Sequence, residues 1–460
     1  YKLKRYFGTA LCVFSQIFIP YLSKVCIFFR LYDKTPKVIF LILYHSKSVF
    51  MHLKKSVVFI SYIFISAFVS AQNHEVGFST MELKNLNWNP GISIQNNDKS
   101  FRLKWGGRIQ YDHAFFRQNK ELDRQEGKLA SGNGTEFRRV WLSSTGAFYQ
   151  NTDFGINVSF EGGRVAFRGV YLKLSDLPWV GNLKMGQIKE PHRLEVLMSS
   201  NHLLFLERTA SVDFAPIFNS GLMVYNDFFN EKLSAQVGLF RNAHPNNAND
   251  LKANGGFNVT GRITGLPLRS KEATLHLGGS YSYRKPGTGT YRVASSGAAH
   301  LSRKKYLDTE EVNVRASQLL NFEFLFVQGP FFIQSEYLKT RIQKRDVLEE
   351  IVFLSTAYSQ ISYCLTGEKR SYKSSLAGLN PLLPRHNFDR NHFGAWEIAL
   401  RYAAADFNDG SVSGGKQQDL TLGLNWYLNP AVKVMANKVW TTFESEKKLA
   451  VFEFRMQLAF

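Results

Sequence analysis

The amino-acid sequence predicts an all-β fold: a transmembrane antiparallel β-barrel of about sixteen strands, with short periplasmic turns and long extracellular loops. Three observations predict it. The last ten residues alternate strictly between apolar and polar side chains, similar alternation recurs from residue 101 onward, and the composition combines 14% aromatic residues with a mean hydropathy of only −0.20. A barrel strand turns one face to lipid and the other to water, which accounts for all three observations.

The final stretch, residues 451–460, has the clearest pattern. Phe460, Leu458 and Met456 lie on its apolar face, and Gln457 and Arg455 lie on the opposite face. A transmembrane barrel needs such a strand, because its outer face contacts lipid and its edge pairs with the first strand. This end also resembles the signal that the barrel-assembly machinery recognises, so Phe460, Leu458 and Met456 are the expected assembly signal. An edge strand of a soluble β-sandwich is the alternative for this stretch alone.

Three regions are expected along the chain. Residues 51–71 begin with a short basic stretch, continue with an apolar run and end in small residues, which is typical of a secretory signal peptide removed after export by the Sec route. Met51 is then the expected start, and residues 1–50 are an upstream segment translated by mistake. One or two transmembrane helices are the rival interpretation, although no apolar run reaches the ~20 residues of a span. Residues 72–460 form the barrel domain.

Composition and motifs argue against several functional classes. Only Cys364 remains beyond residue 72, so neither a disulfide nor a cysteine metal site is expected. The sequence has no phosphate-binding glycine loop, no His-Glu-x-x-His motif and no Gly-x-Ser-x-Gly motif, so we predict no enzyme activity and no cofactor. The net charge of +20 is spread over predicted strands, not gathered in one patch, which argues against nucleic-acid binding.

The predicted strands are joined by connections of two lengths. Tight turns containing proline are expected at 328–330 and 428–430. Long polar loops are expected at 119–135, 242–256, 285–309 and 366–391. Short turns at one end and long loops at the other are typical of outer-membrane barrels. Neither a second domain nor a folded plug is expected.

Several motifs are more specific than a generic barrel. They are Phe-Arg-Arg-Val-Trp-Leu at 137–142, Leu-Lys-Met-Gly-Gln-Ile-Lys-Glu-Pro at 183–191, Phe-Leu-Glu-Arg at 205–208, Gly-Ala-Trp-Glu at 394–397 and Gly-Leu-Asn-Trp-Tyr-Leu-Asn-Pro at 423–430. In this order they resemble the phosphate-selective porin O/P family, over residues 101–460. The resemblance implies a sixteen-stranded outer-membrane barrel, usually a trimer, that passes anions through an arginine-lined pore narrowed by loops. Arg138 and Arg139 match the arginine pair of the family, and Arg208 matches its Glu-Arg position.

Strand alternation adds further basic residues that are expected to face the lumen and bind anions. They are Arg102, Lys104, Arg108, Arg139, Lys173, Arg262, Arg284, Arg401 and Arg455. Guanidinium groups suit phosphate because they form paired charge-assisted hydrogen bonds. Neighbours on a strand point to opposite faces, so Arg138 either lies at the rim or is turned inward by a β-bulge. Alternatively, these bases bridge to lumen acids such as Glu161, Glu323, Glu336 and Glu397.

The expected function is therefore an anion-preferring, water-filled channel in the outer membrane of a Gram-negative bacterium. The expected partners are small anions such as phosphate, outer-membrane lipid, the barrel-assembly machinery, and further copies of the chain in a homotrimer. Two alternatives remain open. One is a structural or adhesive barrel whose loops bind a partner, and the other is an outer-membrane barrel hydrolase.

Overall fold

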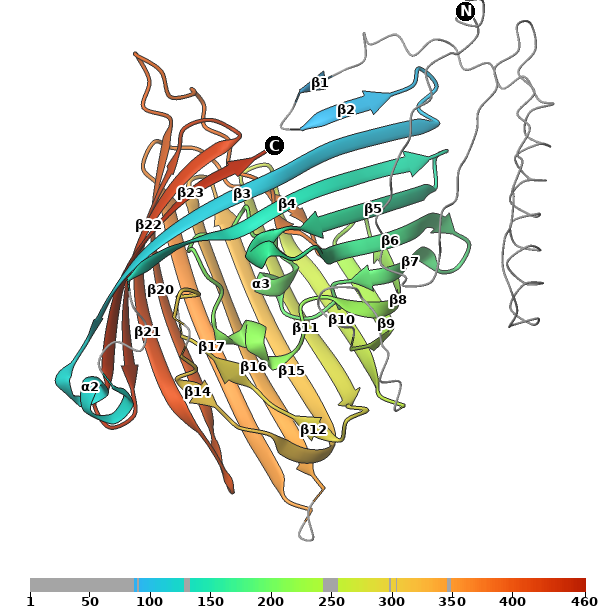
Figure 1. Cartoon of the computed structure of the whole chain (residues 1–460). Coiled ribbons are helices and arrows are strands. Elements are labelled where there is room, and N and C mark those ends of the chain that lie inside the picture. The colour runs from blue at the N-terminus through green and yellow to red at the C-terminus, as the bar shows by residue number, and fades with distance from the viewer. Residues whose placement is uncertain are drawn as a thin grey trace, which may run out of the picture. The chain divides into compact units, whose positions relative to one another are not determined.

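The computed structural model (Figure 1) describes residues 87–88, 91–127, 133–242, 255–297, 299–302, 304–345 and 349–460. The predicted upstream segment 1–50 and signal peptide 51–71 lie outside the described residues, and both remain predictions. Among the helices that the structure describes, none has the length and apolar character needed to cross a membrane.

Sixteen strands of the described chain form one closed antiparallel sheet (Figure 1). They are β3 (Phe101–Gln118), β4 (Gly134–Phe148), β5 (Thr152–Ser159), β6 (Ala166–Leu177), β7 (Gly181–Ile188), β8 (Asn219–Phe228), β9 (Leu233–Arg241), β10 (Phe257–Arg269), β11 (Ala273–Lys285), β15 (Val312–Gln328), β16 (Phe331–Lys344), β17 (Ile351–Cys364), β20 (Ala395–Asp409), β21 (Val412–Tyr427), β22 (Val432–Phe443) and β23 (Lys448–Ala459). Each strand pairs with the next, and β23 pairs with β3 from Leu449 opposite Gln118 to Ala459 opposite Arg108. The predicted barrel and its closure by the C-terminal strand are confirmed.

The other elements are short and lie beside or between these strands. β1 (Asn87–Trp88) and β2 (Ile92–Gln95) extend the sheet beside the start of β3. The remaining elements lie in connections: α2 (Lys120–Glu126), η2 (Glu161–Gly163), α3 (Leu194–Leu197), η3 (Ala210–Phe214), β12 (Thr290–Tyr291), β13 (Ala294–Ser295), β14 (Leu307–Asp308), β18 (Tyr372–Ser374) and β19 (Gly378–Leu379).

Side chains of the barrel wall alternate between two faces, and the polar face is the buried one. On β23, Met456 is 53% exposed, whereas its neighbour Arg455 is 0% exposed. Leu458 also faces outward, and Gln457 is buried. A soluble sheet would bury its apolar face, whereas the apolar face of a barrel in a bilayer contacts lipid. The buried polar side chains therefore belong to the lumen, and recognition of the C-terminal residues by the assembly machinery remains a prediction.

A β-bulge on β4 brings two adjacent arginines to the lumen side. Gln110 on β3 pairs with Arg139, and the next residue of β3, Tyr111, pairs with Phe137. Arg138 is therefore the extra residue of the bulge. At a bulge, two residues of one strand lie opposite a single residue of the partner strand, and this changes the face to which a side chain points. Of the two explanations that the sequence allowed for Arg138, the bulge is confirmed.

The two ends of the barrel differ in their longest connections, although the loop end also carries short turns at 410–411 and 444–447. We call the end at which β3 begins and β23 ends the turn end, and the other the loop end. The tight turns at 328–330 and 428–430 lie at the turn end, and the loops at 119–135 and 285–309 lie at the loop end. The long connection at 366–391 joins β17 to β20, so the antiparallel order places it at the turn end, among the tight turns. The loop expected at 242–256 lies mostly outside the described residues.

Three long connections pack against the inner face of the wall. They are residues 189–218 after β7, 286–311 after β11 and 365–394 after β17. In the second connection, Val293 and Leu307 join an apolar cluster with Ile342 and Phe407 of the wall. The interior near the loop end is therefore apolar. Loops that fold into the barrel are what the family resemblance implies, and the absence of a separate folded plug remains a prediction.

Phe460 pairs with β3 at two glycines. The Phe460 N–H donates to the carbonyl of Gly107 at 3.1 Å, and the Phe460 carbonyl accepts the Gly107 N–H at 2.6 Å. A Cβ added at Gly106 would lie 2.5 Å from the Phe460 carbonyl oxygen, too close for the backbones to keep their positions. Glycine is therefore required where the last residue pairs with β3.

We expect Gly106→Ala to reduce the amount of closed barrel in the outer-membrane fraction severalfold, because the added methyl group separates Phe460 from β3. The fraction of folded barrel is measured by heat-modifiable migration on a denaturing gel. Gly261→Ala on β10 is the matched control, since the nearest atom to its added Cβ is 3.8 Å away. Equal yields of the two variants would contradict the importance of this contact for closure.

Candidate functional site: a basic lumen narrowed by inserted segments

Residues 189–218, which we call the constriction segment, enter the barrel after β7 and return to the wall at β8 (Figure 1). Glu336 on β16 accepts hydrogen bonds from the backbone N–H groups of Leu194 and Glu195, at 2.6 and 2.7 Å. These N–H groups belong to the first turn of α3, where the helix itself supplies no acceptor. A buried carboxylate thus satisfies two donors that would otherwise be costly to bury.

Backbone carbonyls of the constriction segment are held by side chains of the wall. The pairs of donor side chain and carbonyl residue are Gln110–Ser200 at 3.3 Å, Gln457–Asn201 at 3.2 Å, Lys433–Leu203 at 2.8 Å, Asn425–Leu204 at 3.0 Å and Arg455–Leu206 at 2.6 Å. An irregular segment can be buried only if its polar backbone groups find such partners. Donors from β3, β21, β22 and β23 therefore determine where the segment lies.

Residues 365–394, which we call the turn-end insert, enter the barrel from the other end. Arg370 forms a bidentate ion pair with Glu397 on β20, at 2.6 and 2.5 Å, and both side chains are fully buried. The Tyr372 hydroxyl lies 2.9 Å from His276 on β11. These contacts attach the insert to the inner face of the wall at two separate strands.

The turn-end insert also contacts the constriction segment. Leu379 packs with Leu194 and Met198 in one apolar cluster, and the Leu379 carbonyl lies 3.2 Å from Nδ1 of His202. Burial lowers the pKa of His202 to about 4, although its hydrogen bond with Leu379 acts in the opposite direction. His202 is therefore neutral in this contact at neutral pH.

Acidification is expected to weaken the contact between the two inserted segments. A histidine whose folded-state pKa is depressed binds fewer protons when folded, so its contribution to stability falls as the pH drops from about 6.5 towards 4. We expect the protection factors for hydrogen–deuterium exchange in residues 365–394, which correct for the slower intrinsic exchange at low pH, to fall over this pH window. His202→Gln, which cannot titrate, is expected to remove the pH dependence, and an unchanged dependence in that variant would contradict the assignment.

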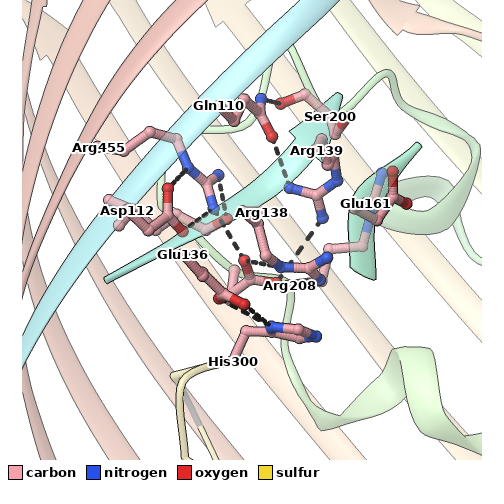
Figure 2. Close-up of polar contacts among 12 residues, drawn as sticks. Gln110, Asp112, Glu136, Arg138, Arg139, Glu161, Ser200, Arg208, His300 and Arg455 are labelled. Atoms are coloured by element: carbon pink, nitrogen blue, oxygen red, sulfur yellow. Dashed lines mark hydrogen bonds and ion pairs between the residues drawn. The ribbon is translucent and has the colours of Figure 1, made fainter. Parts of the chain in front are cut away.

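Three arginines of the lumen surround one carboxylate of the constriction segment (Figure 2). Arg138 donates from Nε and Nη2 to the two carboxylate oxygens of Glu207, at 2.8 and 3.0 Å. Arg455 donates to the same carboxylate at 2.9 Å, and Arg139 lies 3.8 Å from it. Arg455 also forms a bidentate ion pair with Asp112 at 2.6 Å. The arginine pair singled out by the sequence thus lies in one cluster with Arg455.

Four other predicted lumen arginines are also bound to acids or carbonyl groups. The contacts are Arg262–Glu323 at 2.5 Å, Arg284–Glu190 at 2.7 Å, Arg401–Glu195 at 3.7 Å, and Arg208 to the carbonyls of Glu195 and Met198 at 2.8 Å each. The alternative of bridging between bases and acids therefore applies to these positions. Such buried pairs orient segments more than they add net stability.

The four acids that were considered as bridging partners differ in their contacts. Glu323 binds the predicted base Arg262, as described above. Glu161 binds Arg168 at 3.2 Å, and Glu397 binds Arg370, neither of which the sequence singled out. Glu336 binds backbone N–H groups. Strand alternation indicates which face an acid lies on, but it cannot identify its partner.

A cavity of about 600 Å³ at the turn end contains the predicted residues Arg102, Lys104 and Lys173, together with Lys184. Asp153 lies 3.1 Å from Lys173 and 3.9 Å from Arg102. It is the acid of the cavity lining, so four bases face one carboxylate. Sequence reasoning missed Lys184 as a site residue, although its position between two apolar residues on β7 is the signal that could have identified it.

Arg108 lies between this cavity and the arginine cluster on the same wall. Its guanidinium group lies 4.5 Å above the ring centroid of Trp141, and Nη1 donates to the hydroxyl of Ser200 in the constriction segment. A guanidinium stacked on an indole ring is held without a carboxylate partner. Arg108 can therefore present its charge towards the lumen, as the sequence predicts.

Lys189, which sequence reasoning also missed, connects these basic groups. Its ammonium group donates to the carbonyls of Val196, Leu197 and Met198, at 2.6, 3.0 and 3.1 Å. Burial holds the pKa of Lys189 well below its ordinary value, and the positive charges of Arg208, Arg108 and Lys184 act in the same direction. Basic side chains therefore lie close enough to influence one another from the turn-end cavity to the arginine cluster.

A closed barrel with a polar lumen, an exposed apolar face and a segment folded inside is the architecture of an outer-membrane porin. The family model described as phosphate-selective porin O and P matches residues 103–460, so the chain belongs to that family. The resemblance inferred from the motifs is confirmed.

Known relatives and solved structures agree with this membership. The chain is 25% identical to Porin O of Pseudomonas aeruginosa over 377 residues, which cover 75% of this chain and 84% of that protein. It is 24% identical to an uncharacterized protein of Caulobacter vibrioides, covering 74% and 68% of the two chains. The anion-selective porin from Comamonas acidovorans matches with a TM-score of 0.50 at 12% identity, covering 78% of this chain and 100% of that one. The channel DcaP of Acinetobacter baumannii has a TM-score of 0.50 at 9% identity, covering 80% and 99%. At such identities the solved structures show the fold alone.

Proposed function

We propose that the protein is an anion-preferring, water-filled channel through which phosphate or other small anions diffuse across the outer membrane. The observation that carries the proposal is the turn-end cavity, where Arg102, Lys104, Lys173 and Lys184 face the single acid Asp153. Fixed positive charge on a lumen wall raises the local concentration of anions and lowers the barrier to their entry.

The anions are proposed to pass along the wall formed by β3 to β7. Within the described chain, Asp153 pairs with Lys173 and Arg102, and no ion pair joins a carboxylate to Lys104 or Lys184. Arg108 continues the row of bases from the cavity towards the arginine cluster. Conduction favours several weak sites over a single tight one, and a row of separate bases meets this requirement.

Current through planar lipid bilayers tests the proposal most directly. With the purified protein in a KCl gradient, we expect a reversal potential of the sign that chloride selectivity gives. A cation-selective reversal potential would overturn the proposal. Added phosphate, sulfate and chloride then rank the anions by relative permeability.

A structural barrel with a blocked lumen is a second candidate, favoured by the apolar packing near the loop end. Val293 and Leu307 of the 286–311 connection are completely buried against Phe407. This function predicts the absence of measurable current from fully folded protein, together with binding of a partner that depends on the loops. The hydrolase alternative is not supported by the family match, which is to porins.

We further propose that the chain is exported with the segment 51–71 as its signal peptide and assembles as a homotrimer. The solved structure of in-vitro folded OmpT of Vibrio cholerae in a trimer form, which matches with a TM-score of 0.50, supports the trimer by fold analogy alone. Mass determination of the detergent-solubilised protein, with the mature N-terminus sequenced, tests both proposals.

A further inference from the structure

The carboxylate of Glu207 occupies the position in the arginine cluster that a free oxyanion would need. One oxygen accepts from Nε of Arg138 at 2.8 Å and from Nη2 of Arg455 at 2.9 Å, and the other accepts from Nη2 of Arg138 at 3.0 Å. Arg139 lies 3.8 Å from the second oxygen. A phosphate or sulfate ion binds a guanidinium fork through two oxygens in the same way. Glu207 therefore satisfies the donors that such an ion would use.

Arg138 and Glu207 of this cluster are partly exposed, unlike the enclosed pair of Arg262 and Glu323. The side chains of Arg138 and Glu207 are 18% and 12% exposed. By contrast, the Arg262 and Glu323 side chains are both 0% exposed. An ion that moves through the lumen can therefore reach Arg138, whereas it cannot reach the enclosed pair.

The backbone on either side of Glu207 keeps its carboxylate in place. The carbonyl of Leu206 accepts from Arg455 at 2.6 Å, and the carbonyl of Glu207 itself accepts from Arg401 at 2.9 Å. Arg208 donates to the carbonyl groups of Glu195 and Met198. A carboxylate held in this way competes with any free anion, because it is attached to the chain and cannot diffuse away.

The charge of Glu207 persists over a wide pH range. Burial alone would raise its pKa, but the positive charges of Arg138, Arg139 and Arg455 outweigh burial and hold the pKa well below its ordinary value. Arg455 also binds Asp112, and its charge acts on the buried carboxyl group of Glu453. Two of the cluster's acids come from the wall, and Glu207 is the one that the inserted segment supplies.

We propose that Glu207 is a tethered counter-anion that sets the anion affinity of the lumen. While it occupies the arginine cluster, phosphate and sulfate pass without binding tightly there. Removing its charge converts the cluster into a binding site for a tetrahedral oxyanion. This inference rests on the proposed anion channel and deepens it, because it identifies the residue that decides between a general anion pore and a phosphate-binding one.

The test compares wild-type protein with Glu207→Gln, which keeps the shape of the side chain and removes its charge. We expect the phosphate concentration that half-blocks the chloride current to fall by about tenfold or more, the effect of one strong charged hydrogen bond. We also expect phosphate and sulfate to raise the thermal unfolding temperature of Glu207→Gln by several degrees, with little effect on wild type. If the variant fails to fold in chloride, either oxyanion is expected to restore folding, and failure to fold in every anion would overturn the proposal.

Glu161→Gln is the matched control, because it removes the charge of another lumen carboxylate, whose ion-pair partner is Arg168. Equal phosphate block in wild type and Glu207→Gln, or an equal gain in Glu161→Gln, would also overturn the proposal. The thermal measurement requires no current. A cation-selective wild-type channel would contradict the proposed function, while a phosphate-stabilised Glu207→Gln would still support the oxyanion site.

Discussion

Replacing Lys104 and Lys184 by glutamate is expected to convert the channel from anion preference to cation preference. The turn-end cavity changes from four bases and one acid to two bases and three acids. A unit charge about 8 Å from an ion contributes about 0.5 kcal/mol in water. A change of four charge units therefore alters ion partition by about 2 kcal/mol, or roughly thirty-fold before screening by salt. The reversal potential in a KCl gradient measures this change.

The control for this double variant is Lys232→Glu combined with Lys271→Glu. Both lysines lie in turns at the same end of the barrel but outside the cavity lining. This control makes the same change in net charge, so an effect of total charge alone would appear in it as well. If the two double variants shift the reversal potential equally, the cavity does not determine ion preference. Higher salt is expected to reduce the shift in the cavity variant.

Glu397→Gln is expected to release the turn-end insert and to increase single-channel conductance. Removing one partner of a buried ion pair leaves the charge of Arg370 buried and unpaired, which costs about 3–5 kcal/mol. This corresponds to a shift of roughly two to four orders of magnitude in the equilibrium between attached and detached states. Detachment opens the turn end of the lumen, so single-channel recordings are expected to show larger and noisier current steps.

Arg269→Gln provides the comparison for that variant. Arg269 forms its ion pair with Glu231 in an exposed turn at the same end of the barrel. Exposed pairs of this kind contribute about 0–1 kcal/mol, so its conductance is expected to match that of wild type. If Glu397→Gln also has the single-channel conductance of wild type, the turn-end insert does not limit the current.

The barrel could be predicted from the sequence because its strands follow a local rule. Each lumen-facing residue of β23, such as Arg455, lies between two lipid-facing residues, and this period of two is visible without a structure. The bulge at Arg138 could be predicted as one of two solutions, since two adjacent arginines conflict with that period. The constriction segment could not be predicted. Its position depends on donors such as Gln110 and Asn425, which are distant in sequence.

The candidate site could be predicted only in part for a related reason. Alternation places a base on the lumen face but does not say whether an acid neutralises it there. Arg455 on β23 forms an ion pair with Asp112 on β3, where the last strand pairs with the first. The two residues are 343 positions apart in the sequence. Lys104, which has the same alternation, faces a cavity instead. The distinction between a structural arginine and one available to an ion therefore appears only when distant strands are brought together.

The hydrogen bonds of the constriction segment have a consequence for the order of assembly. Gln110 on the first barrel strand and Gln457 on the last share a hydrogen bond of 2.6 Å, and each also donates to a carbonyl of the segment. The segment thus bridges, from inside, the two strand edges that join when the sheet becomes a cylinder. In an open sheet these donors are far apart, and the segment has no complete docking site. Filling of the lumen and joining of the edges therefore occur together, and sideways opening of the finished barrel at this junction requires the segment to withdraw first.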